Sequence, residues 1–234
     1  MKKIIVINHK TYLTLNEAKN YGIDINDYIR GDQEVIICPS NIYIPYFTGK
    51  YNFSLGSQNI SPLEITGETT GKMLKSYNIK YALVGHNERK NNLHETNKEI
   101  NNKIKEAQKY NITPIAILGE TYYEQQLKKS GEIITKTLKE YLKDTNDNII
   151  IGYEPNYTFK EKQIPTKDHI EEIVKLIKQI TKRKYNKEIK VLYGGNVSKE
   201  NIKTLEQIKN LDGYLVGRKA INIKDIKEIF DEME

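Results

Sequence analysis

The sequence is poor in cysteine and in two of the three aromatic residues. Cys38 is the only cysteine, so no disulfide can form within the chain, and a reducing compartment such as the cytoplasm is favoured. Cys38 ends an apolar run that begins at Val35, and we expect a buried structural thiol there rather than a nucleophile. There is no tryptophan and there are only 4 phenylalanines, so the 17 tyrosines and the many isoleucines must supply the apolar bulk of a core.

Long hydrophobic runs are also missing. No apolar stretch approaches the ~20 residues that span a bilayer. The segment Met1-Lys2-Lys3 leads directly into an apolar run that is too short for the hydrophobic part of a signal peptide. The sequence therefore predicts neither a membrane span nor a secretion signal.

The positive charge of the chain is evenly spread. The formal net charge is +6, yet lysine and glutamate are interspersed through the helix-like segments, as in residues 136–143 and 171–184. This pattern is typical of solvated helix faces. We therefore expect no nucleic-acid partner and no membrane partner, whereas a small phosphorylated substrate would benefit modestly from the positive field.

Short apolar runs alternate with amphipathic stretches along the whole chain. The runs cover residues 4–7, 35–38, 53–55, 81–84, 114–118, 149–153, 190–193 and 214–216, and helical patterns are clearest at 97–110, 124–142, 167–180 and 223–230. Continuous apolar runs of this length are typical of strands buried on both faces of a parallel sheet. Eight such strands, each followed by a helix, favour a closed (β/α)8 barrel over an open sheet. Without a linker or a shift in composition, residues 1–234 are predicted to form a single domain, in which the helix within residues 39–50 is the least clear.

Polar residues gather where the predicted strands end. Glu154 follows the run 149–153 and precedes Pro155, which cannot continue a strand and keeps Glu154 extended. The other strand ends carry Asn8-His9-Lys10, Gln58-Asn59, Gly85-His86-Asn87-Glu88-Arg89, Tyr193-Gly194-Gly195-Asn196 and Gly217-Arg218. Each element alone has an ordinary interpretation, as a capping glutamate, a surface lysine, a structural histidine or a turn. In a parallel barrel, however, all these ends meet at one mouth, which carries the chemistry of such enzymes.

Six motifs occur in a fixed order along the chain: Asn8-His9-Lys10, Val84-Gly85-His86-Asn87-Glu88-Arg89, Leu118-Gly119-Glu120, Gly152-Tyr153-Glu154-Pro155, Leu192-Tyr193-Gly194-Gly195-Asn196-Val197 and Asp212-Gly213-Tyr214-Leu215-Val216-Gly217. In order and approximate spacing they resemble the triosephosphate isomerase family over essentially the whole chain. The resemblance implies a TIM barrel. It also implies the interconversion of D-glyceraldehyde 3-phosphate and dihydroxyacetone phosphate through an enediolate, with no metal and no organic cofactor.

By this resemblance Glu154 is the general base, His86 the neutral electrophile and Lys10 a fixed cation beside the substrate. A proton next to a carbonyl is weakly acidic, so the barrier depends on how well the charge on oxygen is stabilised. A helix that begins after His86 would disfavour the imidazolium. Lys10 and His86 come from strands across the barrel from Glu154, which we expect to leave room for a small substrate between base and electrophile.

Other residues are implied to bind the substrate or to support the catalytic ones. Asn8 helps to polarise the substrate, Glu88 supports Lys10, and Tyr193 holds the closed lid. Phosphate is expected at backbone N–H groups after strands seven and eight, which Gly194-Gly195 with the following helix and Gly217 with its own helix would offer. The implied substrate-binding residues are Asn8, Lys10, Lys160, Asn196, Gly217 and Arg218.

The chain departs from the family pattern at three places. The lid, residues 156–162, contains no glycine, and Lys160 stands where a glycine amide usually meets the phosphate. Asn196 stands where a serine is usual and Arg218 where a second glycine is common, although both can donate hydrogen bonds to an anion. The loop at 60–70 is shorter than usual. Because that loop inserts into a partner subunit in the family, the resemblance implies a homodimer, and the shorter loop predicts a looser one.

These departures leave two alternatives open. A paralogous isomerase of a four-carbon ketose phosphate, of the erythrulose phosphate type, resembles the chain at Gly217-Arg218 and in the altered lid, whereas Asn8 favours the triose. A non-catalytic sugar-phosphate-binding barrel should lack at least one residue of the trio Lys10, His86 and Glu154, and this chain lacks none.

Overall fold

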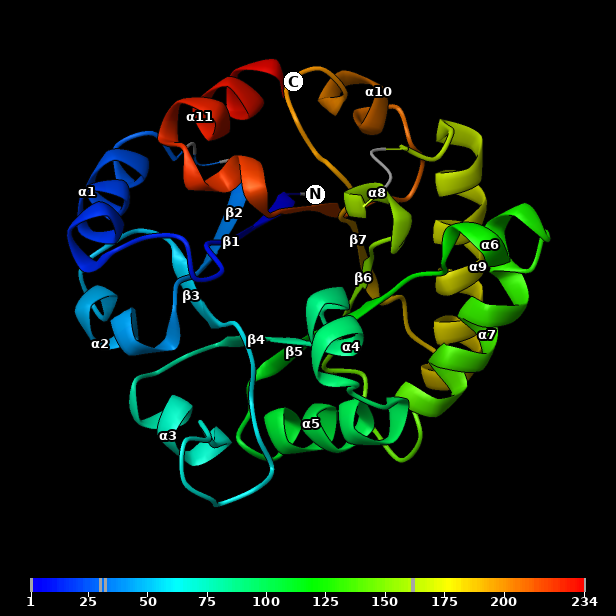
Figure 1. Ribbon diagram of the computed structural model, residues 1–234, viewed down its shortest axis with the longest axis horizontal. Helices are drawn as coiled ribbons and strands as arrows, with labels where there is room; N and C mark the ends of the chain where they lie inside the picture. Colours follow the sequence, from blue (N-terminus) through cyan, green and yellow to red (C-terminus); the bar gives the residue numbers. More distant parts are fainter. Residues whose placement is uncertain (1, 30, 32, 161–162, 234) are drawn as a thin grey trace.

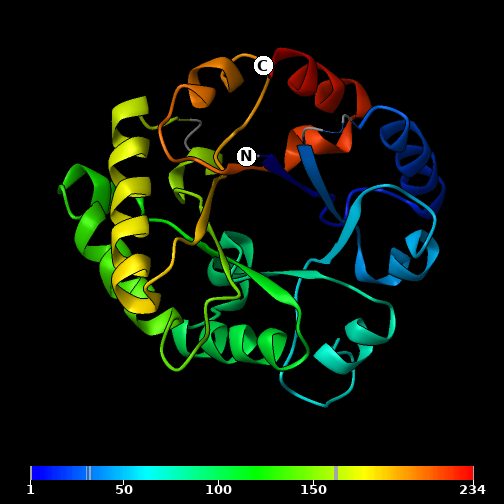
Figure 2. The same ribbon diagram turned by 180° about the vertical axis from the view of Figure 1, so that it is seen from behind.

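Eight parallel strands close into a barrel in sequence order, with β1 paired to β8, and the helices form a ring around them (Figures 1 and 2). The structure is a computed structural model that describes residues 2–29, 31, 33–160 and 163–233. The strands are β1 (Lys3–Asn8), β2 (Gln33–Cys38), β3 (Ser54–Ser57), β4 (Tyr81–Val84), β5 (Thr113–Leu118), β6 (Ile150–Tyr153), β7 (Lys190–Tyr193) and β8 (Gly213–Val216). The α-helices are α1 (Leu15–Asn26), α2 (Ile44–Phe47), α3 (Gly71–Ser76), α4 (Asn87–Leu93), α5 (Asn97–Lys109), α6 (Tyr122–Gln126), α7 (Ser130–Tyr141), α8 (Tyr157–Lys160), α9 (Lys167–Tyr185), α10 (Ile202–Glu206) and α11 (Ile223–Glu232), and the 3₁₀ helices are η1 (Asn41–Tyr43) and η2 (Arg218–Ile221).

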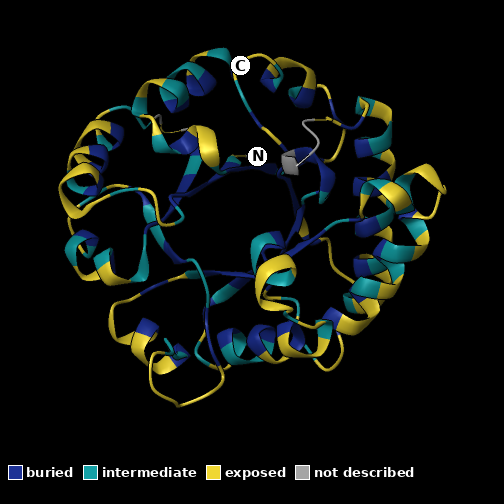
Figure 3. Ribbon diagram, in the orientation of Figure 1, coloured by how far each residue is buried: buried dark blue, intermediate teal, exposed yellow. Residues whose placement is uncertain are grey.

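The strands are buried on both faces, which explains their continuous apolar sequences. Ile4 and Val6 of β1 belong to a cluster made only of strand residues, which fills the barrel, while Ile5 and Ile7 pack in a larger cluster that includes helix residues. Successive side chains of a strand point to opposite faces, so both faces of β1 must be apolar. In Figure 3 the strands are mostly dark blue, and along the helices buried residues alternate with intermediate and exposed ones.

The helices are built from local signals that agree with their packing. In α5, Thr96 accepts a hydrogen bond from the Glu99 N–H while the Glu99 side chain accepts from the Thr96 N–H, which is a capping box. Ile100, Ile104 and Ala107 then follow on the buried face at intervals of three and four residues. Within the described ranges, none of the helices combines the length and the apolar character that crossing a bilayer demands.

The predicted fold class, a (β/α)8 TIM barrel, is confirmed by the closed parallel barrel with helices between its strands. The unclear residues 39–50 contain only η1 and the short α2. One predicted helix is wrong, because residues 124–142 form the end of α6 and all of α7 rather than a single helix. The cause is Lys128, whose φ of 57° is left-handed and interrupts the helical hydrogen bonding.

Candidate active site

Lys10 lies in a tight turn directly after β1. Its φ of 51° is left-handed, a conformation that lysine rarely adopts. The Lys10 N–H donates to Asn8 Oδ1 at 3.0 Å, and Gln58 Nε2 donates to the Lys10 carbonyl at 2.7 Å. The buried Asn8 and the polar end of β3 therefore hold the backbone from which the Lys10 side chain projects. In the sequence Gln58 is recognisable only as a polar residue at a strand end.

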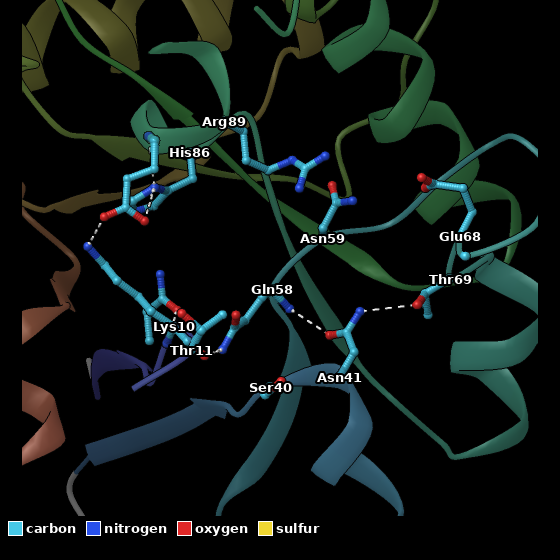
Figure 4. Close-up of a pocket in the computed structure, with 13 residues that line it drawn as sticks. Lys10, Thr11, Ser40, Asn41, Gln58, Asn59, Glu68, Thr69, His86 and Arg89 are labelled. Atoms are coloured by element: carbon cyan, nitrogen blue, oxygen red, sulfur yellow. Dashed lines mark hydrogen bonds and ion pairs between the residues drawn. The ribbon is translucent and has the colours of Figure 1, made fainter. Parts of the chain in front are cut away.

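The Lys10 side chain forms an ion pair at the mouth of the barrel. Its Nζ lies 2.6 Å from Glu88 Oε1, and the side chain of Lys10 is 10% exposed while that of Glu88 is 40% exposed. Figure 4 shows Lys10 and His86 on one side of a cavity of 390 Å³, with Gln58, Asn59 and Arg89 among the other lining residues. The ion pair fixes the direction in which the ammonium points, and it occurs where the sequence predicted support for Lys10.

His86 caps the N-terminus of α4. The Glu88 N–H donates to His86 Nδ1 at 3.2 Å, so Nδ1 carries a lone pair and the ring proton belongs on Nε2. The imidazole is buried, and its Nε2 lies 3.6 Å from Glu154 Oε2. The helix predicted after His86 is thus present as α4, and its N-terminus orients the ring so that the N–H donor faces the carboxylate.

Glu154 follows β6 directly, and its carboxylate faces the His86 ring. The side chain is 20% exposed. Its Oε2 is buried and accepts no hydrogen bond from the part of the chain that the structure describes. A carboxylate oxygen with no bound proton donor keeps its lone pairs available for a substrate proton.

The expected gap between base and electrophile is wrong. A separation of 3.6 Å between His86 Nε2 and Glu154 Oε2 leaves no room for a carbon skeleton between them. The reason is that the Glu154 side chain reaches from β6 toward the end of β4. A bound substrate must therefore displace the Glu154 carboxylate or lie against both groups at once.

A second cavity of 280 Å³ adjoins Glu154 on the side of β7 and β8. Its lining includes Lys10, Thr158, Gly195, Gly217 and Arg218. A Cβ placed on Gly217 would lie 3.5 Å from Lys10 Cε, so the turn after β8 packs beside the Lys10 side chain. The cationic residues Lys10, Arg218 and Lys219 and the backbone of two glycines thus line one small cavity, which suits an anionic group.

The two helices expected after these glycines begin at different distances from them. The 3₁₀ helix η2 begins directly after Gly217, at Arg218. The helix that follows Gly194-Gly195 is α10, which starts only at Ile202. The physical reason lies in Asn196, whose φ of 49° takes the chain into a turn. Any anion held near Gly195 would therefore contact loop N–H groups rather than a helix N-terminus.

The Asn196 side chain contacts the lid. Its Nδ2 donates to the Thr158 carbonyl in α8, so the amide that was predicted to bind substrate is engaged with the lid backbone. Tyr193 is fully buried, and within the described residues its hydroxyl makes no hydrogen bond to the lid. Lys160 ends α8. Its side chain and residues 161–162 of the predicted lid lie outside the described residues.

A buried polar cluster around Glu120 was not predicted from the sequence. Glu120 is fully buried, and its Oε1 accepts from Tyr153 Oη at 3.0 Å and from Ser130 Oγ at 3.3 Å. His169 Nε2 in α9 lies 3.0 Å from the same oxygen. Burial and the neighbouring Glu120 raise the pKa of Tyr153, which stays a neutral donor. The motif Leu118-Gly119-Glu120 marks Glu120 in the sequence. The spacing of the motifs, however, gives no indication that His169 in α9 is its partner.

Lys90 was also missed. Its Nζ donates to the Ile117 carbonyl at 3.3 Å and lies 3.5 Å from Tyr141 Oη. Burial lowers the pKa of this amine to about 8, and the nearby charges of Glu154 and Glu95 oppose the shift. In the sequence, Lys90 is one of many lysines on a helix, and nothing distinguishes it.

His9 lies between Asn8 and Lys10 and points into the core. It is buried, and its ring packs edge-to-face against Tyr21 with centroids 4.4 Å apart. Burial lowers the pKa of His9 to about 4. The neighbouring predicted core thiol, Cys38, is likewise buried, and burial raises its pKa, as expected for a structural residue.

The arrangement suits proton transfer at carbon. It combines a carboxylate without a hydrogen-bond donor on its buried oxygen, an imidazole N–H donor facing that carboxylate, and a fixed ammonium. Among the described residues, no three histidine, cysteine, aspartate or glutamate side chains gather closely enough to hold a metal ion.

Comparison with known proteins agrees with the geometry. The family model described as triosephosphate isomerase matches residues 3–233. The triosephosphate isomerase of Mycoplasmopsis agalactiae is 34% identical over 95% of this chain and 93% of its own length. That of Dictyoglomus thermophilum is 34% identical over 92% and 93%, and that of Mesomycoplasma hyorhinis is 31% identical over 95% and 95%. The chain belongs to the triosephosphate isomerase family.

Proposed function

We propose that this protein interconverts D-glyceraldehyde 3-phosphate and dihydroxyacetone phosphate. The observation that carries the proposal is that Glu154, His86 and the fixed ammonium of Lys10 gather at the barrel mouth beside a cavity. Membership of the family supports the same reaction.

The proposed reaction uses the three groups in sequence. Glu154 removes the proton from the carbon next to the carbonyl, and the electron pair moves to the carbonyl oxygen to give an enediolate. The His86 Nε2–H and the Lys10 ammonium stabilise the charge on oxygen, and His86 moves the hydroxyl proton between the two oxygens. Glu154 then returns its proton to the neighbouring carbon. No cofactor takes part in this scheme, because every proton and electron pair stays within substrate and side chains.

The phosphate is proposed to bind in the 280 Å³ cavity next to Glu154. Gly217 and Arg218 would supply donors from the turn after β8. Asn196 would supply its amide once the phosphate competes with the Thr158 carbonyl for it. The Lys160 backbone amide would complete the grip from the lid, because every non-proline residue carries that donor. Asn8 would act mainly by holding Lys10, since its Oδ1 already accepts the Lys10 N–H.

The protein is further proposed to form a homodimer. Each subunit would be a single domain that comprises residues 1–234. Exposed apolar side chains support the dimer, because Tyr12, Ile42, Leu63 and Ile65 all lie in the segments that follow the first three strands, with Ile42 76% and Ile65 62% exposed. Neighbouring residues of these loops line the cavity of Figure 4, so a second copy seated there would cover the apolar side chains and one wall of the site. The cytoplasm is the proposed location, because the single cysteine is free and buried.

Sedimentation over a dilution series tests the dimer. We expect a monomer to appear at roughly micromolar concentration, and Ile65→Asp to favour the monomer and lower the activity. A wild-type chain that stays monomeric at every concentration and remains fully active would exclude a partner's contribution to the site.

A four-carbon ketose phosphate is the second candidate substrate. The observation that favours it is Arg218, which lines the phosphate-side cavity together with Lys10, in a protein whose lid lacks glycine. The deciding experiment measures kcat/KM for triose and tetrulose phosphates in coupled assays. A preference for the triose supports the main proposal and a preference for the tetrulose supports the alternative. Binding of both without turnover would indicate a sugar-phosphate-binding barrel.

A further inference from the structure

Asn87 directly follows His86 and begins α4. Its side chain is buried, and its Nδ2 donates to the backbone carbonyl of Glu154 at 2.8 Å. In the barrel, β5 lies between β4, which leads into Asn87, and β6, which leads into Glu154. The bond therefore reaches across an intervening strand and ties the segment that carries the electrophile to the segment that carries the base.

The backbone of Glu154 is held on its other sides by the end of β5. The Glu154 N–H donates to the Leu118 carbonyl at 2.8 Å. A Cβ on Gly119 would lie only 2.0 Å from the Glu154 carbonyl oxygen, so this carbonyl packs directly on the Gly119 backbone. Together with the Asn87 amide, these contacts leave the Glu154 peptide little freedom to shift or rotate.

The dipeptide His86-Asn87 thus contacts both the side chain and the backbone of Glu154. The His86 ring approaches the Glu154 carboxylate at 3.6 Å, and Asn87 holds the carbonyl of the same residue. The distance between imidazole and carboxylate depends on this short covalent link, because His86 and Asn87 cannot move independently.

The other end of the Asn87 amide strengthens this interpretation. Its Oδ1 is buried and accepts no hydrogen bond from any residue that the structure describes. Within the described residues, the side-chain hydrogen bond of the Asn87 amide is the one that its Nδ2 donates to the Glu154 carbonyl. This hydrogen bond therefore determines how the Asn87 amide is oriented.

We propose that Asn87 is a positioning residue for the isomerisation. By holding the Glu154 backbone, it fixes the position of the Glu154 carboxylate relative to the His86 ring. Misplacement of a reacting group by about 1 Å can cost on the order of a hundredfold in rate. The proposal rests on the proposed function, because its readout is turnover of the triose phosphate.

The test compares Asn87→Ala with Asn101→Ala. Asn101 is also a buried asparagine whose Nδ2 donates to backbone carbonyls, those of Tyr141 at 2.7 Å and Lys143 at 2.9 Å, but it lines no cavity of the site. Both variants lose a buried hydrogen bond of the same chemistry, so both should melt at a lower temperature. Only Asn87→Ala should lower kcat, by roughly ten- to a hundredfold, with KM changed by no more than about threefold.

Binding probes separate positioning from general damage. The affinity for 2-phosphoglycolate, whose planar carboxylate resembles the enediolate, should fall with kcat in Asn87→Ala, whereas the affinity for inorganic phosphate should stay unchanged. If Asn87→Ala fails to fold, Asn87→Asp has the same shape without the donor and should show the same loss of kcat. Each kcat is normalised to the concentration of sites that bind inorganic phosphate.

Three results would overturn the proposal: a kcat within threefold of wild type in either folded variant, a rise in KM alone, or an equal loss of kcat in Asn101→Ala. A wild-type chain without activity on the triose phosphate would instead refute the proposed function. The two failures are therefore distinguishable.

Discussion

Lys10, in the turn after β1, and Glu88, in α4, are far apart in the sequence but form a 2.6 Å ion pair at the barrel mouth. The exposed member is Glu88, whereas the Lys10 side chain is largely enclosed. An exposed carboxylate is well solvated, so the pair contributes little to stability and serves mainly to aim the ammonium.

Lys10→Ala is predicted to raise KM and lower kcat together, because a fixed cation beside a dianionic substrate favours both the bound substrate and the transition state. Steady-state kinetics on the triose phosphate provide the measurement. Glu88→Gln keeps a hydrogen-bond acceptor for the ammonium and is the milder control. A change in KM alone would make Lys10 a steering charge and remove it from the catalytic group.

Glu154→Gln is predicted to lower kcat by several powers of ten while the protein still binds 2-phosphoglycolate. The amide keeps the shape of the side chain but has no basicity, and general base catalysis alone contributes roughly 10²–10⁴. Turnover and inhibitor binding are measured on the same preparation. Retention of more than about a tenth of the wild-type kcat would exclude Glu154 as the base.

His9→Phe is predicted to make the protein less sensitive to acid. The pKa of His9 falls from 6.5 to about 4 on folding because the ring is buried. Between pH 6.5 and pH 4, His9 is protonated in the unfolded chain but stays neutral in the folded protein. The free energy of unfolding therefore falls as the pH drops toward 4, by about 3 kcal/mol in total. Above pH 6.5 neither state binds this proton, and the contribution is constant.

Urea unfolding at pH 7.5 and at pH 4.5 measures this effect. The phenyl ring preserves the packing against Tyr21. Between pH 7.5 and pH 4.5, the free energy of unfolding should therefore fall less for His9→Phe than for the wild type. An identical difference at both pH values would mean that His9 does not resist protonation in the folded state.

Lys160→Ala is predicted to change kcat/KM by only a few-fold, because the proposed grip on the phosphate uses the backbone amide, which alanine retains. A charged hydrogen bond from the side chain would instead contribute on the order of 2 kcal/mol, or about thirtyfold in rate. Kinetics of Lys160→Ala and Lys160→Arg distinguish the two. A thirtyfold loss in the alanine variant that arginine restores would assign the grip to the side chain.

Much of the barrel follows from local sequence. The apolar runs that become β4 and β7 have the same ends in the structure as in the pattern, because strands buried on both faces need continuous apolar residues. Glu154 was identifiable for the same reason, since a carboxylate followed by proline must end such a run. Helix ends were less certain. The left-handed Lys128 divides a pattern that periodicity presents as one helix.

Contacts between distant segments were decided only by the tertiary structure. The amide of Asn87 reaches Glu154 across β5, and the amide of Asn196 is engaged by the Thr158 carbonyl instead of pointing freely at a ligand. Such pairs depend on backbone angles and side-chain rotamers in the loops, and hydrophobic periodicity carries no information about either. Which residues stand at the mouth of the barrel could be predicted from the order of apolar runs and the polar residues that end them. The folded chain decided which of them touch, because that depends on where eight strands bring their ends together.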